Sequence, residues 1–225
     1  MQRASNLFSA DQRQKIEETV AQAEANTSCE IVPVVATASG RYDRAEDVLG
    51  LWLATIAAIV VWTLYPRTPH ETGDWSGIAF DAGLLALVAS MVVAFLVGGT
   101  LGSQISWLRR LFTPLDQMKD EVAARARQTF FDRRVHHTSS ASGLLVYVSL
   151  FEHRAAILAD QVVLEKLGQD KLDALCQQLT EGLHQGHPTQ AICAVIESAG
   201  QQLAQVLPRT DGTANELPDA LVLID

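Results

Sequence analysis

Two long apolar segments without a charged side chain constrain this chain more than any other feature. The first covers residues 48–65 and the second covers 83–108, and both are dominated by Leu, Ile, Val and Ala. A helix of about 20 such residues is long enough to cross the hydrocarbon core of a lipid bilayer. A buried core helix of a soluble protein is the alternative for each segment. Two such segments in close succession favour a two-helix transmembrane hairpin.

Positive charges indicate the orientation of this hairpin. Arg41 and Arg44 precede the first segment, Arg109 and Arg110 follow the second, and the connecting loop contains Arg67 as its only Lys or Arg. Positive residues beside membrane spans are retained in the cytoplasm. We therefore expect a multi-pass protein of the plasma (inner) membrane with both termini in the cytoplasm and the short loop outside.

The tryptophans and the amino-terminal residues agree with that orientation. Trp52 and Trp107 fall near the inner interface and Trp62 and Trp75 near the outer one, where amphipathic rings are preferred. Residues 1–30 contain no apolar run of the length that a secretory signal needs, which predicts that the amino terminus stays in the cytoplasm.

A pair of glycines in the second segment, Gly98 and Gly102, has the spacing that allows another helix to approach closely. The other helix is either the first segment of the same hairpin or a second copy of the chain. Neither segment has an ionisable side chain near its middle, so no intramembrane ion site is indicated.

The segment before the hairpin has a helix followed by a strand. Ser9 and Gln12 form a capping-box pattern that opens an amphipathic helix. Residues 30–38 are apolar and β-branched at nearly every position, which predicts a strand buried on both faces. Pro33 lacks an N–H group and therefore favours an edge position in this strand.

The segment after the hairpin alternates helices and strands. Residues 115–131 have apolar side chains at helical spacing, and the apolar runs 143–150 and 155–160 are joined by a short polar turn that predicts a β-hairpin. Residues 169–183 and 188–207 again have helical periodicity.

This order of segments predicts an α/β sandwich interrupted by the transmembrane hairpin. Residues 1–47 and 109–207 are the two parts of one cytoplasmic domain, and 48–108 is the hairpin. Residues 208–225 are expected to be an acidic flexible tail, with an added strand at 220–224 as the alternative.

Two classes of protein are disfavoured by composition. The net charge of -9 argues against a nucleic-acid binder, which needs a basic surface. Cys29, Cys176 and Cys193 are odd in number, widely spaced and without a CxxC pair, so we expect buried thiols rather than disulfides or a zinc site.

Four segments resemble the TPM domain family, in the bacterial membrane-bound form that has transmembrane helices inserted in the domain. The resemblance lies in 8–35, 124–160, 182–208 and the short NELPD motif at 215–219. It implies an α/β/α sandwich with a small mixed sheet, without a glycine-rich dinucleotide loop. It also implies two functions, an auxiliary role in assembling or repairing membrane complexes and a phosphatase activity.

Phosphatase chemistry with Ca²⁺ or Mg²⁺ needs clustered carboxylates for the cation and positive groups for the phosphate. The acidic candidates near strand ends are Glu30, Asp43, Glu152 and Asp160. Glu152 and Asp160 are the candidate metal ligands, Arg134 and Arg154 the candidate phosphate partners, and His137 a candidate acid or ligand. The acidic residues lack DxD-type spacing.

Each candidate also has a structural interpretation. Glu152 and Arg154 could form an ion pair that fixes the turn, Asp160 could cap the following helix, and His136 and His137 could lie in an exposed polar turn. The sequence therefore favours a membrane-anchored module with a protein partner in the membrane or cytoplasm, and a cation-dependent phosphatase is the alternative.

Overall fold

The chain divides into two units. The computed structural model describes residues 3–42, 44–65, 82–104, 110–111, 113–138, 142–209 and 216–225. Tyr42–Pro114 forms one unit, here called the hairpin unit, and Gln2–Arg41 together with Leu115–Asp225 forms the other, here called the α/β domain. The α/β domain is thus built from the segments on both sides of the hairpin unit.

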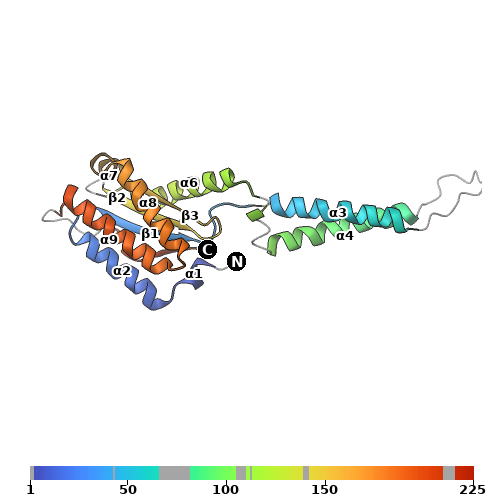
Figure 1. The fold of residues 1–225 in the computed structure, drawn as a ribbon, viewed down its shortest axis with the longest axis horizontal. Helices are drawn as coiled ribbons and strands as arrows, with labels where there is room; N and C mark the ends of the chain where they lie inside the picture. Colours follow the sequence, from blue (N-terminus) through green and yellow to red (C-terminus); the bar gives the residue numbers. More distant parts are fainter. Residues whose placement is uncertain are drawn as a thin grey trace, which may run out of the picture. The chain divides into compact units, whose positions relative to one another are not determined.

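A four-stranded mixed sheet forms the centre of the α/β domain (Figure 1). The strands are β1 (Glu30–Ala36), β2 (Gly143–Ser149), β3 (Arg154–Ala159) and β4 (Val222–Ile224), in the order β3-β2-β1-β4. The pairs β1–β2 and β1–β4 are parallel, whereas β2–β3 is antiparallel. The predicted α/β class and β-hairpin are confirmed.

Helices cover both faces of this sheet. The helices of the α/β domain are α1 (Ala4–Leu7), α2 (Ala10–Glu24), α6 (Leu115–Asp132), α7 (Gln161–Leu167), α8 (Gln169–His184) and α9 (Pro188–Val206). Among the described helices of this domain, α6 alone contributes to the core on one face, and the others contribute to the core on the opposite face. The arrangement is a three-layer α/β/α sandwich, as Figure 1 shows.

Strand β1 is buried on both faces because its side chains alternate between the two cores. Ile31 and Val35 face the core under α2 and α9, and Val32 and Val34 face the core under α6. Such alternation is the period-two geometry of a strand, and burial on both faces explains the continuous apolar sequence.

Pro33 lies in this central strand without breaking a hydrogen bond of the sheet. The N–H of Glu30 donates to the carbonyl of Ser142 on the β2 side. Because backbone N–H groups alternate between the two sides of a strand, the backbone nitrogen of Pro33, three residues later, points toward β4. Pairing with β4 begins only at Val34. The predicted edge position is wrong, because β1 lies between β2 and β4, and Pro33 is tolerated where β4 does not yet pair with β1.

The capping box at the start of α2 is confirmed. The N–H of Gln12 donates to Ser9 Oγ at 3.3 Å, and the N–H of Ser9 donates to Gln12 Oε1 at 2.8 Å. Two helix N-terminal donors are thereby satisfied locally, which is why two residues suffice to predict this helix start.

The expectation of a flexible tail over 208–225 is wrong for its last residues, and the alternative of an added strand within 220–224 is confirmed. Val222–Ile224 forms β4, parallel to β1, and the N–H of Thr37 donates to the carbonyl of Ile224 at 2.8 Å. Asp225 Oδ1 then accepts hydrogen bonds from the N–H of Ser5 at 3.1 Å and from Thr37 Oγ1 at 3.0 Å. The strand forms because β1 offers an unpaired edge, which a tail's own composition does not reveal.

The hairpin unit contains α3 (Arg44–Leu64) and α4 (Ala82–Gln104). Within them, Glu46–Leu64 and Gly83–Gly102 are long and apolar enough to cross a membrane, and only 11% and 6% of the two windows are buried within the chain. Most of their apolar side chains are thus exposed. The predicted second span ends at residue 108. Its last residues fall within 105–109, which lie outside the described residues.

The two helices of this unit meet at a glycine pair. A Cβ atom on Gly98 would lie 2.6 Å from Gly50 Cα, so the backbones of α3 and α4 are too close for any side chain there. A Cβ on the neighbouring Gly99 would meet nothing within 4 Å. Of the two partners that the glycine spacing left open, the first helix of the same hairpin is the one that Gly98 contacts.

We expect Gly98→Ala to weaken the packing of α3 against α4, and Gly99→Ala to leave it unchanged. Both substitutions raise helix propensity equally, so their difference isolates the clash with Gly50. All four tryptophans lie within 48–108, so tryptophan fluorescence during thermal unfolding reports on the hairpin unit alone. Equal unfolding midpoints for the two variants would contradict this packing.

Candidate functional site

The structure places the predicted site residues at two ends of the sheet. Glu152 lies in the turn between β2 and β3, and Arg154 begins β3, whereas Asp160 follows the last residue of β3. A strand rises about 3.3 Å per residue, so Glu152 and Asp160 are separated by roughly 20 Å. They cannot bind one cation together. The grouping of Glu152, Arg154 and Asp160 in a single site is therefore wrong.

Arg134 and His137 lie at the same end of the sheet as Asp160. Both belong to the turn after α6, where Arg134 has a φ of 54° and the carbonyl of Val135 packs against Gly143, the first residue of β2. Both side chains are exposed. The predicted polar turn is thus observed, and it is remote from Glu152.

His136 is held in this turn by aromatic packing. Its ring centroid lies 4.9 Å from that of the exposed Phe131 in a T-shaped contact, and 6.2 Å from that of His137. Edge-to-face contact of this kind adds stability beyond the area it buries.

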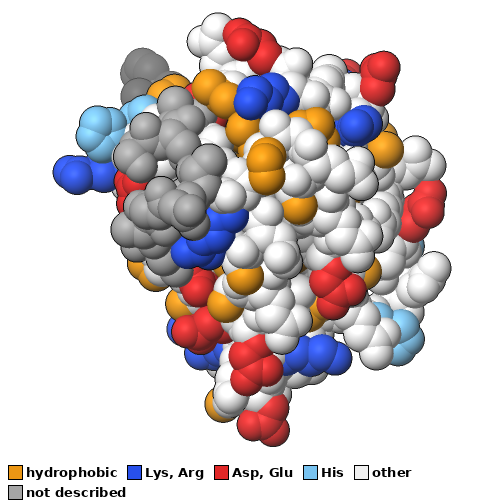
Figure 2. Space-filling view, turned by 90° about the vertical axis from the view of Figure 1, so that its left-hand side faces the viewer, with side chains coloured by type: hydrophobic (Ala, Val, Ile, Leu, Met, Phe, Trp, Pro, Cys, Tyr) orange, Lys and Arg blue, Asp and Glu red, His pale blue; other side chains and the backbone are white. Residues whose placement is uncertain are grey.

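Figure 2, which views Figure 1 from its left-hand side, shows small separate apolar areas among charges of both signs.

Glu152 is a buried structural residue. Its side chain is 2% exposed, and Oε1 accepts hydrogen bonds from the N–H groups of Ser39 at 2.8 Å and Gly40 at 3.2 Å. Oε2 accepts a short hydrogen bond from Ser149 Oγ. The carboxylate therefore ties the β2–β3 turn to the chain that leaves β1.

A hydroxyl cluster extends this network along the α6 face of the sheet. Ser39 Oγ lies 2.9 Å from Tyr147 Oη and donates to Ser149 Oγ at 2.8 Å. Burial raises the pKa of Tyr147, and the carboxylate of Glu152 adds to this effect. Ser39, Tyr147, Ser149 and Glu152 form what we call the turn network, which lies where β1 and β2 end.

Asp160 caps helix α7. Its Oδ1 accepts a hydrogen bond from the N–H of Gln161 at 2.7 Å, and its backbone has the extended geometry of an N-cap. The capping interpretation is confirmed. Oδ2 is buried and accepts no hydrogen bond from the residues that the structure describes.

Two further buried carboxyl groups, Glu24 and Glu30, lie where β1 begins. Glu24 Oε1 accepts a hydrogen bond from the N–H of Ile31 at 2.6 Å, and Glu24 shares a side-chain hydrogen bond with Asp219. The oxygens of Glu30 accept from the N–H groups of Glu216 and Leu217, both at 3.3 Å. These contacts hold the segment that leads to β4.

The environment of Glu24 favours its protonated form. Burial raises its pKa from 4.5 to about 8, the N–H of Ile31 opposes the rise, and the carboxylates of Glu30 and Asp219 add to it. Burial also raises the pKa of Glu30 and of the neighbouring Cys29 thiol. A proton on Glu24 supplies the donor for the hydrogen bond with Asp219.

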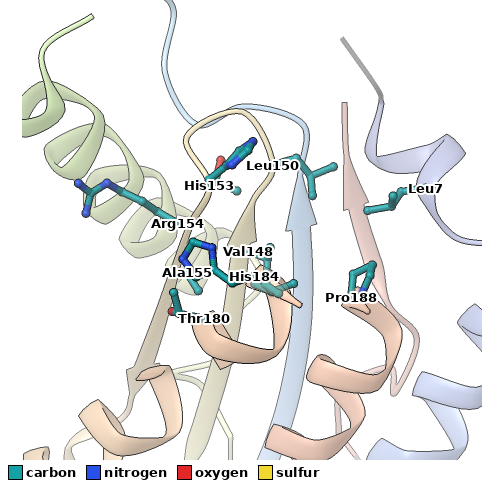
Figure 3. A pocket seen from close by; sticks show the side chains of 11 residues that line it. Leu7, Val148, Leu150, His153, Arg154, Ala155, Thr180, His184 and Pro188 are labelled. Atoms are coloured by element: carbon teal, nitrogen blue, oxygen red, sulfur yellow. The ribbon is translucent and has the colours of Figure 1, made fainter. Parts of the chain in front are cut away.

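A pocket of about 220 Å³ opens beside the β2–β3 turn, on the sheet face covered by α8 and α9 (Figure 3). Its apolar lining comes from Leu7, Val148, Leu150, Ala155, Leu183 and Pro188. Its polar lining comes from Ser149, His153, Arg154, Thr180 and His184, and none of the described lining residues is Asp or Glu. Figure 3 shows that Arg154 extends away from the pocket toward α6.

The described residues contain no group of three or more His, Cys, Asp or Glu that could hold a metal ion. The Ca²⁺ or Mg²⁺ cofactor therefore stays a prediction of the sequence resemblance. The three cysteines are free thiols, with Cys29 and Cys193 buried and Cys176 half-buried, as expected.

Comparison with known proteins identifies a similar fold. No family model and no curated protein sequence matches the chain. The NMR structure of the BA42 protein from the psychrophilic bacterium Bizionia argentinensis is similar, with a TM-score of 0.55 and 17% sequence identity. The match covers 96% of this chain and 94% of BA42. The fold is TPM-like. At this identity the similarity concerns the fold alone.

The pocket and the buried glutamates were not predicted from the sequence. The pocket combines residue 7, the β2–β3 turn and the α8–α9 connection, which are far apart in the sequence. In the sequence alone, His184 cannot be distinguished from an ordinary loop histidine. Glu24 lies on a helix with many charged residues, and no pattern distinguishes it from them. In the sequence Glu30 is only an acidic candidate near a strand end, and its contacts with Glu216 and Leu217 are not evident there.

We expect Glu152→Ala to destabilise the α/β domain by about 2–4 kcal/mol, because it leaves two backbone N–H groups unpaired in a buried turn. Asp160→Asn should change stability by less than about 0.5 kcal/mol, since Asn caps helices nearly as well as Asp. All three cysteines lie in this domain, so the reaction of a thiol dye during heating measures its unfolding. A larger effect of Asp160→Asn would contradict these roles.

We expect the α/β domain to lose stability as pH rises from about 4.5 to about 8. In this window the unfolded chain has an ionised Glu24 and the folded chain a protonated one, so the folded state binds more protons. Glu24→Gln keeps an acceptor for the N–H of Ile31 and a donor for Asp219, and its side chain does not ionise in this pH range.

The variant should therefore match the wild type near pH 4.5 and unfold at a higher temperature near pH 8, as circular dichroism can measure. Some pH dependence should remain, because the raised pKa of Glu30 acts in the same direction. A variant with the same pH profile as the wild type would show that Glu24 is not the titrating group.

Proposed function

We propose that this chain is a membrane-anchored module in which the hairpin unit lies in the lipid bilayer and the α/β domain, in the cytoplasm, binds a protein partner during assembly of a membrane complex. The exposed apolar surface of α3 and α4 carries the proposal. Its large exposed side chains include Leu51, Trp52, Ile56, Ile59, Trp62, Leu84, Leu85, Val92, Val93 and Leu96.

Such a surface is unfavourable in water, since each square ångström of exposed apolar area costs about 25 cal/mol relative to an apolar environment. Soluble monomers seldom expose continuous apolar areas of this kind. Lipid provides the apolar surroundings, and the backbone groups of both helices are paired within the helices, as a membrane requires. The absence of charged side chains over 48–65 and 83–108 agrees with this placement.

A binding role rather than catalysis is supported by the hydrogen bonds of the acidic candidates Glu152 and Asp160, which stabilise the fold. Glu152 binds the backbone of the chain that leaves β1, and Asp160 caps α7. The length of β3 separates Glu152 and Arg154 from Asp160, so this group gives no support to a phosphatase, which stays a prediction of the resemblance. The open pocket beside the β2–β3 turn is mainly apolar, which suits recognition of a partner.

The proposed topology predicts which cysteine variants react from outside the cell. Ser76→Cys, in the loop between the spans, should react with a membrane-impermeant maleimide in intact spheroplasts, because that loop is expected outside. Ala174→Cys, at an exposed position of α8, should react only after the membrane is opened. Positive residues flanking the spans give the physical reason for this orientation.

The wild-type chain is the control for its own three cysteines, two of which are buried. A chain that is recovered in the soluble fraction, or an Ala174→Cys variant that is labelled in intact spheroplasts, would contradict the membrane topology.

A further inference from the structure

The pocket beside the β2–β3 turn has the properties of a binding site for one side chain of a partner. Its volume of about 220 Å³ is below the range of about 300–1,000 Å³ that is usual for small-molecule and cofactor sites. A single large apolar side chain is of suitable size. Such insertion of one anchor residue into a pocket is how many protein interfaces concentrate their affinity.

The polar groups of the pocket favour a negative charge next to that side chain. His153 and His184 border it from two different elements, the β2–β3 turn and the end of α8, as Figure 3 shows. An imidazole N–H donates to a carboxylate, and none of the lining residues that the structure describes is Asp or Glu. Glu152, although next to His153 in the chain, directs its carboxylate to Ser39, Gly40 and Ser149.

The pocket is framed by parts of the fold that are held in place. The turn network fixes the turn that carries His153, and this residue has the left-handed φ of 52°. On the helical side, a Cβ on Gly182 would lie 2.7 Å from Ala191 Cβ, so α8 and α9 pack closely here. This contact lies next to the pocket residues His184, at the end of α8, and Pro188, at the start of α9. A preformed pocket binds with less loss of conformational entropy than one that must be ordered.

We infer that this pocket binds a large apolar side chain at the carboxyl end of a partner polypeptide, together with the terminal carboxylate next to it. The inference rests on the proposed function, since it names the chemistry that the binding module recognises. The apolar lining supplies the contact area, and His153 and His184 select the negative charge.

The test uses two small probes with the full-length chain in lipid nanodiscs. N-acetylphenylalanine has the aromatic side chain and a carboxylate, and N-acetylphenylalaninamide is the same compound without the charge. Methyl NMR signals of Val148 and Leu183 in the pocket report binding, and the signal of Leu145, on the opposite face of the sheet, is the control.

The acid should shift the pocket signals with a Kd on the order of millimolar, as expected for a ligand of this size, and leave Leu145 unchanged. Because a charge-assisted hydrogen bond is stronger than a neutral one, the acid should bind at least about fivefold more tightly than the amide. Replacing both imidazoles, His153→Ala with His184→Ala, should remove this preference and keep weak binding of the amide.

Two pocket-filling variants test the location. Ala155→Leu places a larger side chain in the pocket lining and should abolish the shifts caused by both probes; Thr180→Leu does the same from α8 if the first variant does not fold. Ala174→Leu, at an exposed site on the same helix, is the matched control and should bind as the wild type does.

Pocket signals that do not move with either probe, or equal affinities for acid and amide in the wild type, would overturn the inference. So would binding that survives the filling of the pocket. These results are independent of the cysteine labelling, so membrane anchoring can hold while the pocket assignment fails.

Discussion

The parallel pairing of β1 with β2 is the contact on which the α/β domain depends. It joins residues 30–36 to residues 143–149, so the two halves of the domain are linked across the whole hairpin unit. Seven residue pairs form this contact, and both strands are buried on both faces. The outer strands border this central pair, since β3 pairs with β2 and β4 pairs with β1.

Buried carboxyl groups hold both ends of β1. Glu152 binds the backbone where the chain leaves the strand, and Glu24 binds Ile31 near its beginning. Glu30 binds the segment that leads to β4. Buried carboxyl groups are costly unless they are paired, and here backbone donors or a proton compensate for the lost water. Among the acidic candidates from the sequence, Glu30 and Glu152 thus have structural roles in the sheet and Asp160 caps α7. Asp43 lies outside the described residues.

Local features of the fold could be read from the sequence, and non-local ones could not. The Ser9–Gln12 capping box and the Asp160 cap involve neighbouring residues, and the apolar stripe of α6 follows from helical periodicity. Strand β4 follows from the sequence only as the alternative to a flexible tail, because its three residues acquire their conformation from an unpaired edge of β1 some 190 positions earlier. The pocket was missed for a related reason, since its lining comes from separate segments that only the tertiary fold brings together.

Direct evidence on the surroundings of α3 and α4 would come from electron paramagnetic resonance of the full chain in lipid bilayers. A spin label on a cysteine at Val93, which is 60% exposed on α4, should be highly accessible to molecular oxygen and poorly accessible to a water-soluble nickel chelate. A label at Ala174 should show the reverse pattern. High accessibility of position 93 to the nickel chelate, or protection of that position from both reagents, would contradict a lipid-facing hairpin.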